Sequence, residues 1–451
     1  GGGAGATTSA SVVFVSATPQ VVSVRASGGV ESSLVVFQVR DASGNPVTAG
    51  QTVNFTMSGP GGGRQPSAGG EYIGTDDGTP TQQTAATVAN GTASIRLNAG
   101  TVSGPVTITA TVSTPTGSVS STSSTISIGG GVASASHFNI ASSRLNLQGR
   151  VSSGVQATIS AYIADRFGNF NVLQGTTVSF YTEAGGIDTS NITDATGLTT
   201  VVFRTQAPMP NDIAISPAEI TMINNLNSAY GTTFPTTGSV HPSDGHLTVL
   251  ATVAGEETFI DANGNGLYDV GEARTDIGEP FIDADDNGTF DSSEFYVDTN
   301  GNGTYDGPNG VWDGPSCPEA GCITQKTIWT SMNLAFTGNI TNCYLALTPT
   351  PGSTYTISAS GSQQFRFMLG DTDLNAPLAG TTISVTTSKG ALVGTTNYTV
   401  PDAVGGPVEI FFTLLDPDSD ATVDSSSVTV QVTPANGITA CPSITMTGTV
   451  Q

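Results

Sequence analysis

Short runs of alternating β-branched or aromatic and polar residues recur along this chain, separated by turn-forming residues about every 8–12 positions. Ser11–Ser16, Leu34–Val39 and Val428–Val432 are examples. Alternation with period two places one set of side chains on one face of a strand, while Gly, Asn, Asp, Pro and Ser supply the turns. Short strands at this spacing predict antiparallel β-sandwiches, so we expect an all-β fold.

The chain also repeats itself three times, each copy having a polar turn followed by an alternating strand. The turns begin at Asp41, Asp165 and Asp371, and the strands are Gly50–Phe55, Gly175–Phe180 and Gly380–Val385. Asp and Asn bond their own backbone, which suits them to turns. The 451 residues have room for several domains of roughly 100–200 residues each. We predict three, at 1–133, 134–338 and 339–451.

This triple pattern resembles the bacterial immunoglobulin-like domains of the invasin and intimin type. A second shared unit supports the resemblance: Gly91–Leu97, Gly197–Phe203 and the looser Gly406–Phe412. The resemblance implies tandem immunoglobulin-like β-sandwiches that act as rigid extracellular spacers or adhesive tips without enzymatic activity. It names no ligand, because function depends on sites and not on folds.

The predicted middle domain carries an acidic insert at about residues 256–326. Fifteen of the 36 acidic residues lie between Glu256 and Asp313, with Arg274 as the only basic residue there. Three 12-residue loops within it begin at Asp261, Asp283 and Asp298. Each loop is preceded by a Glu four residues earlier. Three copies in the same register favour a shared purpose over a set of unrelated acidic turns.

These loops match the calcium loop of the EF-hand type, with oxygen ligands at positions 1, 3, 5, 7, 9 and 12 and Gly at position 6. Ca²⁺ takes about six to eight hard oxygen ligands. We therefore predict about three calcium ions. The candidate ligands are Asp261, Asn263, Asn265, Leu267 (by its carbonyl), Asp269 and Glu272; Asp283, Asp285, Asn287, Thr289, Asp291 and Glu294; and Asp298, Asn300, Asn302, Thr304 and Asp306.

Loop three departs from the pattern because Asn309 stands at its twelfth position, so this site is either weaker or borrows Asp313. Glu294 ends loop two just before loop three and is placed to bridge two ions. Gly and Pro residues flank the loops and oppose helices, so the loops resemble those of dockerins or thrombospondin type 3 repeats. We expect calcium to staple the insert and to be coupled to its folding, with a ligand-binding or regulatory role as the alternative.

Two further local signals concern the cysteines and a helix. Four cysteines predict two disulfides in an exported chain, and sequence order pairs Cys317 with Cys322 and Cys343 with Cys441. Ser216-Pro-Ala-Glu219 combines a capping box with a first-turn Pro, which predicts a short helix from Pro217 to about Ser228.

The net charge of −24 repels nucleic acid and anionic lipid but suits divalent cations. The chain contains no run of 18 apolar residues, so we predict no transmembrane helix. The sequence begins Gly1-Gly2-Gly3, from which we expect that a signal peptide was removed, as in a bacterial lipoprotein whose lipidated Cys precedes a short tether. No serine-hydrolase elbow, zinc-protease motif or phosphate loop occurs, so an enzyme is not expected.

These observations predict a secreted structural protein of the bacterial cell surface. We expect a self-assembling subunit of an extracellular fibre, in which the alternating segment Thr7–Val15 adds as a strand to a neighbour's sheet. The alternative is a monomeric, lipoprotein-type adhesin that binds a cell-surface or glycan ligand. A third reading, an accessory module of a polysaccharide-degrading system, rests on the dockerin-like loops alone.

Overall fold

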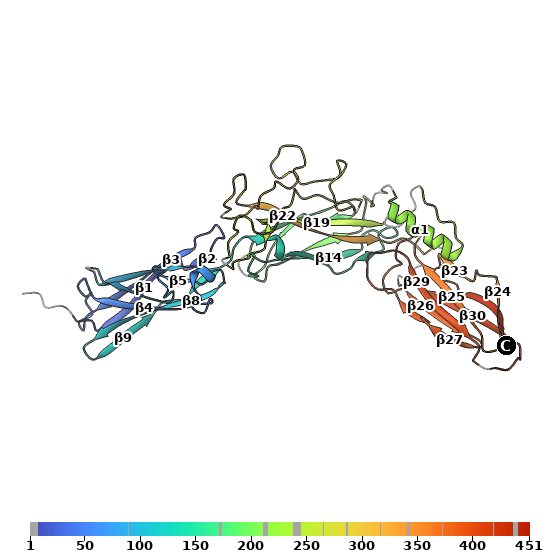
Figure 1. The fold of residues 1–451 in the computed structure, drawn as a ribbon, viewed down its shortest axis with the longest axis horizontal. Helices are drawn as coiled ribbons and strands as arrows, with labels where there is room; N and C mark the ends of the chain where they lie inside the picture. The colour runs from blue at the N-terminus through green and yellow to red at the C-terminus, as the bar shows by residue number, and fades with distance from the viewer. Residues whose placement is uncertain are drawn as a thin grey trace, which may run out of the picture.

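Three β-sandwiches lie end to end in a long, bent row in the computed structural model (Figure 1). The structure describes residues 8–88, 90–170, 174–210, 215–237, 245–264, 266–285, 287–315, 317–340, 343–371, 373–417, 419–435 and 441–451. The predicted all-β class and tandem immunoglobulin-like architecture are confirmed. No α-helix within those ranges is long and apolar enough to cross a membrane.

The first sandwich packs two sheets around one apolar core. One sheet has the order β1 (Ser11–Thr18), β3 (Ser32–Arg40), β7 (Thr92–Asn98), β5 (Tyr72–Ile73). The other has the order β2 (Val21–Ser23), β10 (Ile126–Gly129), β8 (Gly104–Thr114), β4 (Thr52–Ser58), β6 (Gln82–Ala86), with β9 (Gly117–Thr122) paired to β8. A 3₁₀ turn spans Pro66–Ala68.

The second sandwich follows the same plan. One sheet has the order β12 (Phe138–Ser142), β14 (Gln156–Ile163), β18 (Leu198–Arg204), β16 (Gly186–Ile187). The other has the order β13 (Asn146–Leu147), β22 (Lys326–Phe336), β19 (His246–Glu256), β15 (Thr177–Thr182), β17 (Ser190–Ile192), with β11 (Ala133–Ser134) paired to β19. A 3₁₀ turn spans Ala135–His137, and β20 (Thr258–Phe259) pairs with β21 (Arg274–Thr275) in the insert.

The third sandwich has sheets in the orders β23 (Ala346–Thr348), β25 (Ser362–Leu369), β29 (Val408–Leu415), β27 (Ala391–Gly394), and β24 (Thr354–Ile357), β31 (Ile444–Val450), β30 (Asp424–Thr433), β26 (Thr382–Thr387), β28 (Asn397–Thr399). Both predicted disulfides are confirmed, and the bond from Cys343 to Cys441 closes this sandwich across 98 residues.

Period-two alternation accounts for the cores. In β4, for example, every second residue is buried, so Val53, Phe55 and Met57 face inward. Full burial of one such large apolar side chain contributes roughly 1.5–3 kcal/mol. Three separate clusters of this kind form, with members running from Val12 to Ile128, from Ala133 to Phe336 and from Ile340 to Val450.

The predicted helix is confirmed as α1 (Pro217–Tyr230), and the side chain of its N-cap Ser216 accepts the backbone N–H of Glu219. Although α1 lies between β18 and β19 in sequence, it lies beside β23 of the third sandwich (Figure 1). Its Leu226 and Tyr230 pack on Ala346 and Met368 of that sandwich. The helix therefore braces the joint between the second and third sandwiches.

The alternating N-terminal segment forms a strand of its own sandwich, and its addition to a neighbour's sheet stays a prediction. The segment expected to add to a neighbour's sheet belongs largely to β1, which pairs antiparallel with β3 of its own sandwich from Ser11 to Thr18. Its inward residues fill the first core: Val12 is buried and Phe14 packs against Phe37. Because β1 lies at the edge of its sheet, pairing with β3 uses the backbone groups on only one side of the strand.

Candidate metal centre

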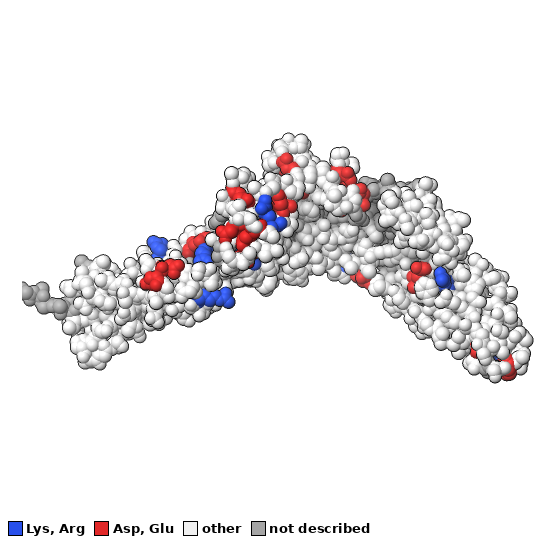
Figure 2. Space-filling model, in the orientation of Figure 1, with Lys and Arg blue, Asp and Glu red and all other residues white. Residues whose placement is uncertain are grey.

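The acidic insert leaves the second sandwich at the hairpin-like pair β19 and β22, where Gly255 lies opposite Lys326. It projects from one side of the middle sandwich as a group of loops (Figure 1). Acidic side chains gather over these loops, while most of the visible surface of the third sandwich is uncharged (Figure 2). Very little regular structure holds the insert, so its side chains must do so.

Two aromatic clusters form the small cores on which the loops rest. Tyr268 of loop one stacks on Trp312 with ring centroids 5.0 Å apart. Phe290 of loop two stacks on Tyr305 of loop three at 3.9 Å, and both rings lie edge-on to Phe281. The aromatic residues at position 8 therefore anchor all three loops, and loops two and three share one core.

The first residue of every loop is an aspartate that gathers the loop backbone around its carboxylate. Its two oxygens accept N–H groups from near the middle of the same loop, including the glycine at position 6. These hydrogen bonds are Gly264 N and Gly266 N to Asp261 (2.7 and 2.6 Å), Asn287 N and Gly288 N to Asp283 (3.0 and 2.8 Å), and Gly301 N and Gly303 N to Asp298 (2.6 and 2.8 Å). The glycines at position 6 have φ of 77–79°, the left-handed region that lets the chain turn sharply there.

A glutamate closes each loop by accepting the N–H groups of positions 2 and 9. In loop one, Glu272 accepts Ala262 N and Asp269 N at 2.8 and 3.1 Å. In loop two, Glu294 accepts Ala284 N and Asp291 N, both at 2.8 Å. Each glutamate also donates its own N–H to the carbonyl of position 9. Position 12 therefore closes both loops by hydrogen bonds to their backbone.

Loop three is closed by Glu279, a residue that precedes loop two. Glu279 accepts Thr299 N (position 2) at 2.7 Å and Asp306 N (position 9) at 3.1 Å, and its N–H donates to Asp306 O at 2.9 Å. These are the bonds that Glu272 and Glu294 make. The borrowing of Asp313 that loop three was expected to need finds no support, because Asp313 pairs with Lys326 at 3.0 Å.

Sequence reasoning missed Glu279 because it counted ligands along one continuous loop. The signal was present in the Glu four residues before each loop, which recurs at Glu257, Glu279 and Glu294. Glu294 makes its hydrogen bonds to Ala284 and Asp291, both in loop two, so those bonds give no support to the expected bridge between loops two and three.

Loop two brings together a donor set that fits a hard divalent cation. In loop two, one carboxylate oxygen each of Asp283, Asp285 and Glu294 lie within 4.8 Å of one another. Burial raises the pKa of Glu294, and the neighbouring charges of Asp283 and Asp285 raise it further, which shows how poorly this cluster tolerates its own charge. A cation would relieve that repulsion, and carboxylate and amide oxygens are the ligands that Ca²⁺ prefers.

The remaining candidates lie on the same loops. Asn287 and Asn302, at position 5, donate their side-chain amides to the position-9 carboxylates of Asp291 and Asp306 at 2.8 and 2.7 Å. Their amide oxygens accept the N–H groups of Thr289 and Thr304 at position 7. At position 3, the side chains of Asn263 and Asn300 bond the carboxylates of Asp269 and Asp306. Leu267 stands at position 7 of loop one, and Asn265 lies outside the described residues.

Comparison with known proteins gives similarity to solved structures only. No protein-family model and no curated protein matches the chain. Invasin, a bacterial integrin-binding protein, is 14% identical over 93% of this chain and 56% of its own, with a TM-score of 0.26. The Escherichia coli adhesin FdeC is 14% identical over 98% and 96%, with a TM-score of 0.34, and the Yersinia pseudotuberculosis adhesin InvE is 16% identical over 56% and 58%, with a TM-score of 0.20. The chain thus spans little more than half of invasin, and similarities of this size say nothing about ligand or partner.

Proposed function

We propose that this chain is a calcium-stabilised, rod-shaped segment of a secreted adhesin of the bacterial cell surface. Three sandwiches, at 1–133, 134–338 and 339–451, form the rod, and the loops at Asp261, Asp283 and Asp298 hold about three calcium ions. The observation that carries the proposal is that directional contacts, several of them partly or fully buried, join the sandwiches at both joints. A row of domains joined in this way suits the presentation of a binding surface at a distance from its anchor.

The first joint is organised by Arg166, whose side chain is 10% exposed. It donates to Ala26 O of the first sandwich at 2.9 Å, pairs with Glu256 of the second at 2.8 Å, and donates to Gly266 O at 3.0 Å. Gly266 is position 6 of loop one. One arginine thus joins two sandwiches to a calcium loop, so an ordered loop one would stiffen this joint.

The second joint uses Asp402 of the third sandwich, which accepts Asn146 N at 2.9 Å and Leu145 N at 3.0 Å. An ion pair between Arg150 and Asp373 at 3.2 Å lies in the same joint, and helix α1 packs on the third sandwich. Backbone N–H groups bonded to a carboxylate leave little room for rotation, because a hydrogen bond weakens steeply when it bends.

Calcium would supply the positive charge that the insert lacks. Carboxylates at positions 1 and 9 and the closing glutamates Glu272, Glu294 and Glu279 would hold it, and its loss would leave them to repel one another. Extracellular modules bind Ca²⁺ with dissociation constants of about 10⁻⁴–10⁻³ M, which suits the calcium level outside a cell. The two disulfides also fit an oxidising compartment.

Sedimentation velocity and electron microscopy of the purified chain, in millimolar calcium and in chelator, test this proposal. We expect monomeric bent rods that bind calcium and attach saturably to a cell surface or a glycan array, with a more variable bend in chelator. Ordered filaments would favour the fibre subunit instead. Absence of calcium uptake by calorimetry would remove the calcium part of the proposal.

A further inference from the structure

A fourth loop of the same kind is assembled from two separate stretches of the insert. Asn309-Gly310-Val311-Trp312-Asp313 repeats positions 5–9 of loop three, Asn302-Gly303-Thr304-Tyr305-Asp306. No aspartate stands four residues before Asn309, where position 1 of a continuous loop would lie. The structure brings Asp276, 33 residues away in sequence, to that place.

The bonds around Asp276 repeat those around Asp298. Asn309 N and Gly310 N donate to the two carboxylate oxygens of Asp276 at 3.1 and 2.6 Å. In loop three, Asn302 N and Gly303 N donate to the two oxygens of Asp298 at 3.2 and 2.8 Å. Gly310 has a φ of 88°, in the same left-handed region as Gly303 at 77°.

The closing glutamate is repeated as well. Glu257 accepts Ile277 N and Asp313 N at 2.9 and 3.0 Å, and its own N–H donates to Asp313 O at 2.9 Å. Ile277 and Asp313 are positions 2 and 9 of this split loop. The amide of Asn309 also donates to the carboxylate of Asp313 at 2.9 Å, as the amide of Asn302 does to that of Asp306.

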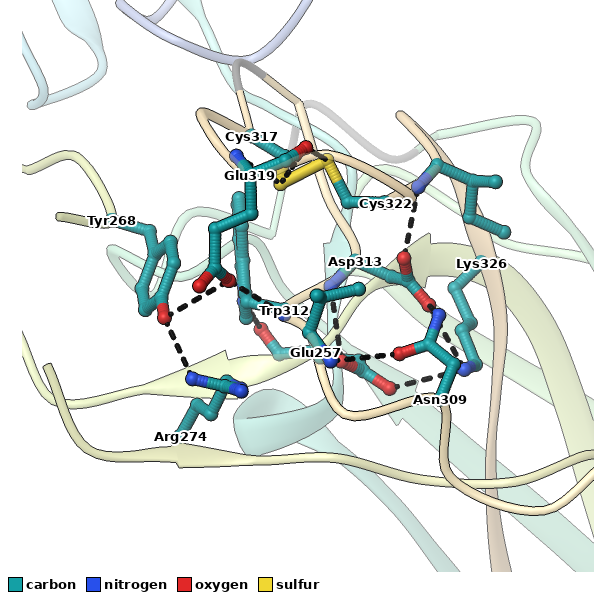
Figure 3. The surroundings of a disulfide bond; sticks show 12 residues. Glu257, Tyr268, Arg274, Asn309, Trp312, Asp313, Cys317, Glu319, Cys322 and Lys326 are labelled. Atoms are coloured by element: carbon teal, nitrogen blue, oxygen red, sulfur yellow. Dashed lines mark hydrogen bonds and ion pairs between the residues drawn. A yellow bond between two sulfur atoms is a disulfide. The ribbon is translucent and has the colours of Figure 1, made fainter. Parts of the chain in front are cut away.

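Two features of the split loop differ from loops one to three: Gly278 stands at its position 3, where they have Asn or Asp, and a lysine lies beside its carboxylates. The ammonium group of Lys326 lies 3.2 Å from Glu257 Oε1 and 3.0 Å from Asp313 Oδ2, the carboxylates of positions 12 and 9 (Figure 3). Both carboxylate side chains are fully buried, and that of Lys326 is 12% exposed. A buried carboxylate pair of this kind requires a cation beside it.

We propose that Lys326 is a built-in cation that takes the place of calcium in this fourth loop. The split loop is then closed by the chain alone, without metal, and removing the ammonium opens a fourth calcium site. The inference rests on the calcium role proposed above for the other three loops. Only two lysines occur in the chain, and this one is the first residue of β22.

The split loop lies at the base of the insert, where β19 ends and β22 begins. Glu257 directly follows β19, Lys326 begins β22, and the bond between Cys317 and Cys322 lies beside them (Figure 3). Trp312 is fully buried and donates its indole N–H to Glu257 O at 2.8 Å. The root of the insert therefore stays folded when calcium is absent, and the outer loops order on it when calcium returns.

The test compares the purified wild-type chain with Lys326→Met by calorimetric calcium titration and native mass spectrometry. We expect three ions in the wild type and four in the variant. We also expect the variant to unfold at a lower temperature than the wild type in chelator and to recover most of the difference in millimolar calcium. The matched control is Lys389→Met, which removes the other lysine from an exposed pair with Asp424 and should keep three ions and normal stability.

Further variants separate the possible failures. The double variant Glu257→Gln/Lys326→Met removes one carboxylate together with the ammonium, and we expect it to fold in chelator and bind three ions. A Lys326→Met chain that binds no more ions than the wild type, or that calcium fails to restore, overturns the built-in cation. A wild type that binds no calcium defeats the proposed role of loops one to three. In that event, one ion gained by Lys326→Met still supports the fourth site. If Lys326→Met gains no ion, the fourth site is overturned.

Discussion

The backbone N–H of Gly338, between the second and third sandwiches, donates a hydrogen bond to Oδ2 of Asp371 at 2.9 Å. The linker between the first and second sandwiches repeats this contact, with Gly131 N donating to Oδ2 of Asp165 at 3.1 Å. In both turns the other carboxylate oxygen accepts two N–H groups of the turn itself. The repeated turn therefore receives the end of the preceding sandwich as well as reversing the chain.

Replacing Asp371 with Asn should weaken the second joint and leave the turn intact. The amide oxygen can still accept Asp373 N and Asn375 N, but the amide NH₂ then faces the N–H of Gly338. Loss of this hydrogen bond costs about 1–3 kcal/mol, which denaturant unfolding would measure as a lower free energy of unfolding. X-ray scattering would show a wider range of angles at the joint. The matched control is Asp41→Asn, in a turn whose Oδ1 makes the same two bonds, with an expected change within about 0.5 kcal/mol. Equal losses in both variants would contradict the linker role.

The same aspartate gives a pH dependence of defined sign. Burial raises the pKa of Asp371 above its ordinary value of 3.8, outweighing the N–H groups of Gly338 and Asn375, which lower it. Because the folded state then holds the proton more tightly than the unfolded state, the contribution of Asp371 to stability falls as the pH rises from about 4 through the raised pKa. Above that pKa the contribution is constant. Urea unfolding of the wild type and Asp371→Asn across this range should show their difference shrinking with rising pH, and a growing difference would contradict the assignment.

Local signals predicted most of the fold. Alternating strands, the capping box at Ser216 and the pairing of four cysteines each depend on neighbours in sequence or on a few discrete choices. The repeated Asp turns were also visible, but their contact with Gly131 and Gly338 was not. That contact depends on how one sandwich packs against the next, and the alternation of residues along a strand carries no information about it.

The candidate site was predicted in part for the same reason. Loops one and two are continuous, so counting positions from Asp261 and Asp283 gives the closing glutamates correctly. Loop three is closed by Glu279, which lies 27 residues before its partner Asp306 in sequence. The split loop is closed by Glu257, which lies 56 residues before its partner Asp313. Such exchange is set by the stacking of the loops in space.

Glu279→Gln should remove one calcium ion or weaken its binding by at least about 10–100-fold, because calcium affinity follows the charge of the ligands. Calorimetric titration should then show two tight sites where the wild type has three. Glu31→Gln, in the first sandwich, is the control, because it removes the same charge away from the loops and should leave three tight sites. If Glu279→Gln still binds three ions as tightly as the wild type, Glu279 does not close loop three.

Helix α1 should limit the bend between the second and third sandwiches. Leu226 is buried against the third sandwich, and the hydroxyl of Tyr230 donates to Glu409 at 2.7 Å. Leu226→Ala removes apolar contacts worth about 2–5 kcal/mol, so the helix should detach more often and the joint should sample a wider range of angles. X-ray scattering should show a broader distribution of lengths, and hydrogen exchange should speed up in α1 and β23. Asn225→Ala, at an exposed position of the same helix, is the control, and equal behaviour of the two variants would show that α1 does not brace the joint.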